Sequence, residues 1–434
     1  MEATRHGSPT ENCSDPSPTP LDRGMRLFGF ARRALFPLFL LLLNFVSRAL
    51  FAAEPLVPLA VPLPANLTAS AQVIENERDG LWEKTLIVSF PEARRAISTQ
   101  EGFVVARAAV NHAMHPLLSR HFMSDMRAWD VYIDRIHGKI ARSLKTQRRR
   151  LATMGTSADM ENLAVVTKEY GPFTVTALVT GGAETNALRT GLDEGTHIET
   201  SHGTINILLL TNARLSDGAI ARAIITVTEA KTAALEDLKV PSSTTKSAQA
   251  TGTGTDNVIV VSGVSGPRVT YTGGHSRIGE LIGKAAYGAV IEALGKQNGF
   301  LLPGAEPYVT KGSLKRQAAF ESAEKWLSTL DDGELAAAWD AASALAKRTK
   351  TREAWDEALT KSRAGLGKAI ARKTSRNLPT RALDGLPRGE YMLLEFVSRF
   401  ENREDLVERI TARQDEDGIW RVVDYSIDLQ ERED

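Results

Sequence analysis

Residues 204–238 read TINILLLTNARLSDGAIARAIITVTEAKTAALEDL, and this stretch decides how the first half of the chain folds. The segment 204–212 is too apolar to have a face in water, which predicts a buried strand. Ser216 and Asp217 can cap a helix that follows it. The apolar residues of that helix recur at steps of three or four and predict one packed face: Ile220, Ile224, Val227, Ala230, Ala234 and Leu238.

The neighbouring segments repeat this alternation of strand and helix. Residues 83–90, 173–180 and 257–261 have the β-branched, apolar character of strands, and residues 277–294 have a helical pattern. Residues 123–150 also look helical, and they end in a basic run that is typical of a solvated face. The alternation predicts an α/β or α+β N-terminal domain.

The second half of the chain has a different order of elements. Helical patterns come first, over 314–349 and from 351 to a glycine-rich stop near 365–367. Three segments within 389–429 then predict an antiparallel meander with a hairpin turn at Asp417-Gly418. This order predicts a smaller α+β domain with its helices packed on the sheet, and we find no catalytic group of residues in it.

The chain therefore divides into six parts. They are a polar tail (1–24), a signal peptide (25–53), a Pro-rich spacer (54–71), the first domain (72–295), a Gly/Pro-containing linker (296–313) and the α+β accessory domain (314–434).

The N-terminal segment predicts export. Arg26, Arg32 and Arg33 precede an apolar run over 34–46, and small residues at 51–53 offer a cleavage site. The run is shorter than the ~20 residues that a spanning helix needs. We expect a periplasmic or secreted protein, with transient membrane contact through this segment. The alternative is an inner-membrane anchor, and translation could start at Met1 or Met25.

Composition excludes several functions. Basic and acidic residues number 53 each, which gives no reason to expect a nucleic-acid partner. Cys13 is the only cysteine and lies outside both domains, so we expect no disulfide framework, thiol nucleophile or cysteine metal site. His112 and His115 would share a helix face, a spacing that can bind zinc, with His121 nearby. No carboxylate stands in register with them, so we expect a structural or solvated pair and no metal site.

Polar residues gather at the predicted strand ends in five motifs. These are TGGAETNALRTG (180–191), GTINILLLTN (203–212), TEAKTAAL (228–235), TGTGTDNVIV (251–260) and YTGGHSRIGELIGKA (271–285). Each taken alone could be turn or packing material. In this order they closely resemble the adenosylcobinamide amidohydrolases, known as CbiZ. The upstream stretches 90–112 and 151–160 resemble the weaker N-terminal part of the same pattern.

The resemblance implies hydrolysis of the aminopropanol amide of adenosylcobinamide, or a related corrinoid, to give cobyric acid in corrinoid salvage. The corrinoid would be the substrate, and no cofactor is expected. Amide hydrolysis needs a nucleophile, a base and oxyanion donors. The candidate catalytic residues are Asp256, His275, Glu229, Thr253 and Thr255. The candidate binding residues are Thr180, Gly182, Asn186, Thr204, Asn206, Lys231, Gly252, Gly254, Tyr271, Gly274 and Asn111.

Two other functions stay open at this point. One is an exported corrinoid-binding protein without catalysis, and the other is an exported amidase of different specificity. The export signal and the second domain both depart from what the resemblance leads us to expect.

Overall fold

The computed structural model describes residues 58–123, 126–195 and 203–429. The predicted tail and signal segment, residues 1–53, lie outside the described residues. Among the described helices, none combines the length and apolar character that crossing a bilayer requires.

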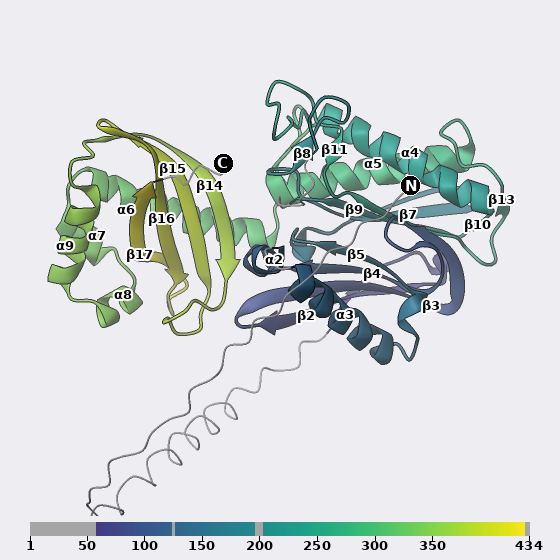
Figure 1. Ribbon diagram of the computed structural model, residues 1–434, viewed down its shortest axis with the longest axis horizontal. Helices are drawn as coiled ribbons and strands as arrows, with labels where there is room; N and C mark the ends of the chain where they lie inside the picture. The colour runs from purple at the N-terminus through teal and green to yellow at the C-terminus, as the bar shows by residue number, and fades with distance from the viewer. Residues whose placement is uncertain (1–57, 124–125, 196–202, 430–434) are drawn as a thin grey trace, which may run out of the picture. The chain divides into compact units, whose positions relative to one another are not determined.

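One curled sheet organises the first domain (Figure 1). Its described strands follow the order β1-β2-β3-β12-β9-β7-β6. In addition, β4 pairs with β3, and β5 pairs with β4. Their bounds are β1 Leu59–Val61, β2 Ser70–Arg78, β3 Leu81–Ser98, β4 Gly102–Met114, β5 Leu151–Thr156, β6 Ala164–Tyr170, β7 Phe173–Gly181, β9 Ile205–Thr211 and β12 Asn257–Val261.

The long strand β3 makes the sheet fold over on itself. Its first half pairs with β2, its last residues pair with β12, and its pairing with β4 shifts register between Ser89 and Arg94. An irregularity of this kind bends a strand. The sheet therefore forms two layers, and an apolar core that includes Leu86, Met154 and Leu208 fills the space between them.

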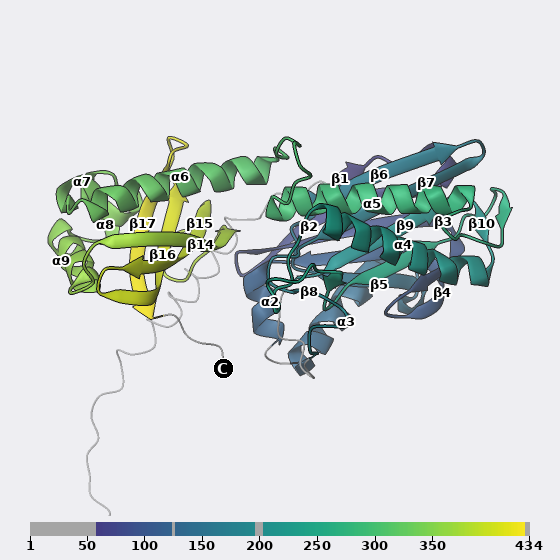
Figure 2. The same ribbon diagram turned by 90° about the horizontal axis from the view of Figure 1, so that it is seen from above.

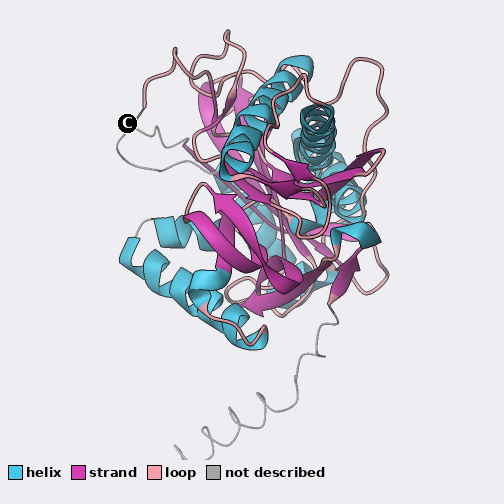
Figure 3. Cartoon of the chain, turned by 90° about the vertical axis from the view of Figure 1, so that its right-hand side faces the viewer, coloured by secondary structure: helices cyan, strands magenta, loops and turns pink. Residues whose placement is uncertain are grey.

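Helices cover the outer face of each layer (Figures 1 and 3). Helices α4 (Asp217–Asp237) and α5 (Arg277–Asn298) pack on β7, β9 and β12, and Figure 2 shows them lying along this layer. Helix α3 (Met126–Ser143) covers β3, β4 and β5, preceded by α2 (Pro116–Met123). Ser216 caps α4, as the sequence predicts, by accepting a hydrogen bond from the N–H of Ala219.

Short elements complete this domain. Strand β8 (Ala187–Leu188) pairs with β11 (Gly252–Thr253), and β10 (Arg214–Leu215) pairs with β13 (Arg268–Val269). The 3-10 turns are η1 (Ala65–Leu67), η2 (Arg148–Arg150) and η3 (Met160–Asn162). The three arginines of η2 are exposed, which agrees with the predicted solvated face.

The second domain places helices on one face of an antiparallel sheet, as predicted. The helices are α6 (Lys311–Asp331), α7 (Leu335–Asp340), α8 (Ala344–Thr349) and α9 (Arg352–Arg363). The strands are β14 (Ala369–Thr380), β15 (Tyr391–Phe400), β16 (Arg403–Gln414) and β17 (Trp420–Leu429), in that order across the sheet. Trp326, Trp355 and Phe396 lie in their shared core.

Three details differ from the expectations. Strand β14 adds a fourth strand to the predicted meander; it lies at the sheet edge, where one face stays in water and the apolar pattern is weak. Strand β1 and the buried Leu67 belong to the first domain, although the sequence predicts a spacer over residues 54–71. His112 lies on strand β4 rather than on a helix.

Candidate active site

Strand pairing brings three of the five motifs to one end of the sheet. Thr180 lies at the end of β7, opposite Asn206 at the start of the antiparallel strand β9. Asn206 in turn lies opposite Asn257 at the start of β12, which is parallel to β9. Asp256 immediately precedes β12. Residues that are 26 positions apart (Thr180 and Asn206) and 51 positions apart (Asn206 and Asn257) therefore become neighbours.

A buried amide network joins the two sheet layers at this end. The Nδ2 atom of Asn206 donates to the Oδ1 atom of Asn111 at 3.0 Å and to the carbonyl of Gly155 at 2.8 Å. The Nδ2 atom of Asn111 donates to the hydroxyl of Thr180 at 2.8 Å. All three side chains are at most 2% exposed. Because buried polar groups are costly unless they are paired, this network holds the two layers in one relative position.

An ion pair lies on the other face of the same strand end. Lys231 of α4 binds the carboxylate of Asp256. That carboxylate also accepts hydrogen bonds from the N–H of Ile205 at 2.9 Å, the N–H of Thr253 at 3.0 Å and the hydroxyl of Thr253. The side chains of Lys231 and Asp256 are only 10% and 13% exposed. The hydroxyl, the carboxylate and the ammonium therefore form a connected and mostly dry set, which we call the Thr–Asp–Lys cluster.

The glycines of TGTGTD make room for these contacts. A Cβ atom on Gly252 would lie 2.6 Å from the Nζ atom of Lys231 and 2.7 Å from an oxygen of Asp256. A Cβ atom on Gly254 would lie 2.9 Å from the Oδ1 atom of Asn186. All three distances are too short for a real contact, so the two glycines serve close packing of polar side chains.

The remaining predicted residues of this region secure the loops. The hydroxyl of Thr204 donates to the carbonyl of Thr255 at 2.6 Å, and the hydroxyl of Thr255 donates to the carbonyl of Gly203 at 2.8 Å. Asn186 donates to the same carbonyl at 2.8 Å. Gly203 has a φ of 138°, which a residue with a side chain adopts only with strain.

A cavity of about 1130 Å³ opens beside these loops. Gly182, Gly203 and Thr204 form part of its wall, and Thr204 directly precedes the residue whose N–H binds Asp256. The wall continues through residues 157–159, the C-terminal end of α5 and residues 374–379 of β14. The volume lies just above the usual range of ligand pockets, roughly 300–1,000 Å³.

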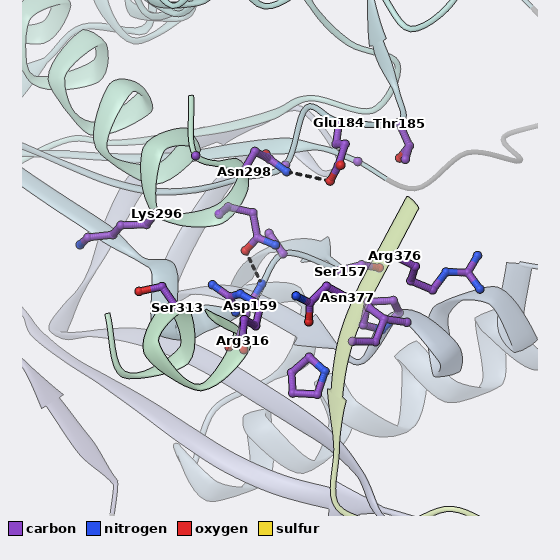
Figure 4. Close-up of a pocket in the computed structure, with 18 of the residues that line it drawn as sticks. Ser157, Asp159, Glu184, Thr185, Lys296, Asn298, Ser313, Arg316, Arg376 and Asn377 are labelled. Carbon is purple, nitrogen blue, oxygen red and sulfur yellow. Dashed lines mark hydrogen bonds between the residues drawn. The ribbon is translucent and has the colours of Figure 1, made fainter. Parts of the chain in front are cut away.

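Polar groups that the sequence analysis did not select also line this cavity (Figure 4). Glu184 and Asn298 lie side by side, with the Nδ2 atom of Asn298 3.5 Å from the Glu184 carboxylate. Asp159 accepts from the ammonium of Lys84 at 2.7 Å. Burial opposes the charge of Lys84, but Asp159 and Glu161 outweigh it and raise the pKa of Lys84. Glu184 and Asp159 stand inside stretches that carry the family resemblance, so their position in those motifs was the available signal.

Four predicted residues lie away from the cluster. His275 and Tyr271 stack with ring centroids 5.2 Å apart, and His275 and Gly274 precede the first residue of α5. Helix α5 has 22 residues and spans about 33 Å, and its opposite end carries Asn298, which binds the N–H of Ala183 next to Gly182. The structure therefore does not bring His275 to Asp256. Glu229 lies on the exposed side of α4, turned away from the buried Lys231.

His112 on β4 and His115 just after it are each buried among different partners, and the described residues include no group of three or more side chains suited to hold a metal ion. The two ring nitrogens of His112 lie 2.8 Å from the Thr85 hydroxyl and 2.6 Å from the Tyr132 hydroxyl. Burial lowers the pKa of His112 to about 4, so the ring is neutral at physiological pH. His115 is buried separately and contacts the carbonyl of Pro379 at 2.8 Å.

The fold and the site define an α/β domain in which a hydroxyl, a carboxylate and an ammonium form a connected cluster behind the Gly203–Thr204 wall of a large cavity. Comparison with known families is more specific: the adenosylcobinamide amidohydrolase model matches residues 67–301, and the chain belongs to this family. Residues 322–425 match a family described as a protein of unknown function, DUF4019.

Two curated relatives match the first domain. An uncharacterized protein of Methanocaldococcus jannaschii is 42% identical over 240 residues, which cover 51% of this chain and 91% of that protein. An adenosylcobinamide amidohydrolase of Methanosarcina mazei is 34% identical over 139 residues, which cover 30% of this chain and 59% of that relative. The chain thus spans less than two thirds of the relative that carries the activity in its name. The family resemblance read from the five motifs is confirmed.

Proposed function

We propose that this protein hydrolyses the aminopropanol amide bond of adenosylcobinamide or a related corrinoid and releases cobyric acid. One observation carries the proposal: the region that matches the family contains both the Thr–Asp–Lys cluster and most of the wall of a cavity of about 1130 Å³. A corrinoid is a large substrate whose periphery carries many amides. A large cavity whose wall combines apolar surface with several polar groups suits such a molecule.

The cluster has the parts that activation of a nucleophile requires. The hydroxyl of Thr253 donates to the Asp256 carboxylate, and Lys231 and two backbone N–H groups hold that carboxylate in place. A nucleophile bonded to a base that a third group orients is the general arrangement for attack on a carbonyl. We favour Thr253 over Thr255, because the Thr255 hydroxyl already donates to a backbone carbonyl.

The proposed reaction consumes one water molecule. An oxygen, from Thr253 or from a water held by Asp256, adds to the amide carbonyl carbon, and its proton passes to the carboxylate. The C–N bond then breaks, and the nitrogen takes up the proton and leaves as aminopropanol. If Thr253 attacks directly, water hydrolyses the resulting ester. Glu184 is the second candidate base, since its carboxylate lies in the cavity itself. No cofactor takes part, so a chelator should leave the rate unchanged.

Incubation with cobinamide and adenosylcobinamide tests the proposal. Mass spectrometry should detect cobyric acid and aminopropanol in equal amounts. Absence of both products under varied pH and metal content would overturn the amidase assignment. A corrinoid absorbance band on the purified protein without turnover would instead support the binding protein, and turnover of unrelated amides alone would support an amidase of other specificity.

Matched substitutions test the site. Asp256→Asn and Thr253→Ala should lower kcat by a factor on the order of 10²–10⁴, which is typical for loss of an activating group. Glu229→Gln, the same chemical change on the exposed side of α4, and His275→Ala should keep kcat within about twofold, because neither residue reaches the cluster. The opposite ranking would move the chemistry to the other end of α5. Loss of activity in Glu184→Gln alone would assign the base to the cavity carboxylate.

We also propose that the protein acts outside the cytoplasm. The support is the sequence of residues 25–53: arginines, then a short apolar run, then small residues. A substrate met before uptake could lack the adenosyl ligand. N-terminal sequencing of the protein in a periplasmic extract should find a mature terminus near Glu54. A membrane-bound chain that retains residues 38–43 would indicate an anchor, and a soluble cytoplasmic chain would contradict both.

A further inference from the structure

The outer side of α4 carries opposite charges around an exposed apolar residue. Arg222, Ile225 and Glu229 are three and four residues apart, so they lie on one side of the helix. All three are exposed, and the Ile225 side chain is 53% exposed. Residues of α4 that face the core, such as Ala223 and Val227, are fully buried. This exposed side, which we call the α4 outer face, is therefore distinct from the packing face of the helix.

These charges do not pair with each other along the helix. Arg222 and Glu229 are seven residues apart, whereas intrahelical ion pairs join residues three or four apart. No ion pair joins Glu229 to any residue that the structure describes, and Arg222 lies 4.6 Å above the ring of Tyr271. Intrahelical stabilisation thus does not account for this arrangement, whereas pairing with a second helix would use both charges.

We propose that the α4 outer face is the interface of a two-fold symmetric homodimer in which α4 packs antiparallel against α4 of a second copy. Ile225 lies about midway between Arg222 and Glu229. A two-fold axis midway between Arg222 and Glu229, beside Ile225, therefore puts Arg222 opposite the partner's Glu229 and Glu229 opposite the partner's Arg222. The same patch contacts itself, as a two-fold interface requires, and the interface contains two Arg222–Glu229 ion pairs.

The neighbouring residues suit close approach of two helices. Gly218 and Ala233, one on each side of the charged pair, are exposed and have little or no side chain. They would lie opposite each other in the antiparallel arrangement and permit the interaxial distance of about 8–10 Å that packed helices adopt. Tyr271, which is 40% exposed, adds apolar area beside Arg222. Aromatic residues and arginine are the types enriched at the centres of such interfaces.

Charge reversal and charge exchange test this dimer. Sedimentation velocity of the purified protein should show a dimer. Glu229→Arg and Arg222→Glu should each raise the Kd of the dimer by at least about tenfold, because each replaces two attractive pairs with two repulsive ones. The double variant Arg222→Glu/Glu229→Arg restores both pairs in exchanged positions, and it should return the Kd to within about threefold of the original.

Glu357→Arg on α9 is the matched control, since Glu357 is also an exposed helix glutamate and the charge change is the same. It should leave the Kd unchanged. A protein that is monomeric at all concentrations would overturn the proposal. So would a dimer that is insensitive to both single reversals, or a double variant that is weaker than either single one. Circular dichroism of each variant separates loss of the dimer from loss of the fold.

Discussion

The buried ion pair between Lys231 and Asp256 makes a quantitative prediction. Lys231→Met removes the ammonium and leaves the Asp256 carboxylate with two backbone N–H donors and the Thr253 hydroxyl. Asp256→Asn removes the negative charge and leaves a lysine that is 8% exposed as a whole residue and has no other ion-pair partner among the described residues. The double variant removes both charges. Together these three variants form a double-mutant cycle.

Breaking a buried ion pair by removing one partner typically costs 3–5 kcal/mol, because the remaining charge stays buried. We expect about 3 kcal/mol for Lys231→Met, since Asp256 keeps three donors. We expect about 4–5 kcal/mol for Asp256→Asn, since Lys231 then keeps no negatively charged partner. The double variant leaves no unpaired charge and should cost about 3–4 kcal/mol. This is well below the total of the single losses, and the coupling energy is therefore about 4 kcal/mol.

The chain has two domains, so the measurement must report on the first one alone. Hydrogen exchange in increasing urea, read by mass spectrometry on peptides that cover β9 and β12, gives the free energy of unfolding of that core. Single-variant losses that add up in the double variant to within about 0.5 kcal/mol would refute the ion pair. Losses below about 1 kcal/mol in each single variant would refute the burial on which the magnitude rests.

Three further predictions follow from other contacts. Because the pKa of His112 falls from 6.5 to about 4 on folding, the unfolded chain binds more protons in that window, and His112 alone should cost the first domain about 3 kcal/mol of stability as pH falls from 6.5 to 4; the same exchange experiment on His112→Gln should show the loss reduced by that amount, while His115 and His137, whose pKa values burial also lowers, keep the remainder. Gly252→Ala should lower both stability and kcat, because its Cβ would displace the Lys231–Asp256 pair, whereas Gly138→Ala, within α3 and near only a flexible arginine, should raise stability by about 0.5–1 kcal/mol. Asn206→Leu should cost the first domain about 2–4 kcal/mol in urea unfolding, since it leaves buried groups on both sheet layers without a hydrogen-bond partner; an unchanged unfolding midpoint would show that the amide network does not join the layers.

Much of the fold could be predicted from local sequence patterns. The strand over 205–211 and the capped helix after it were predicted because a run of buried aliphatic residues and a helical stripe are properties of consecutive residues. The glycine turn at Gly418, which has a φ of 80°, was predicted for the same reason. Strand β14 was missed because an edge strand buries little of either face, so its sequence carries little alternation.

Only part of the site could be predicted from the sequence. Motif resemblance selected Asn111, Thr180, Asn206 and Asp256, and the structure brings them to one end of the sheet. The same reasoning selected His275, which lies beyond the far end of α5. Motif order says nothing about which end of a strand or helix a residue occupies in space. Glu184 lies within a motif, but the motif does not indicate its exposure to the cavity, because that exposure depends on loops from several strands.

The sequence by itself determined the strand over 205–211 and the capped helix after it, the presence of two domains and the membership of the amidohydrolase family, because each of these depends on neighbouring residues or on the order of motifs. Tertiary structure alone decided that Asp256 pairs with Lys231, that Asn206 reaches across to Asn111 in the other sheet layer, and that His275 does not join them. The physical reason is that these contacts depend on strand register and on the bend in β3, and both are set by packing between segments far apart in the chain.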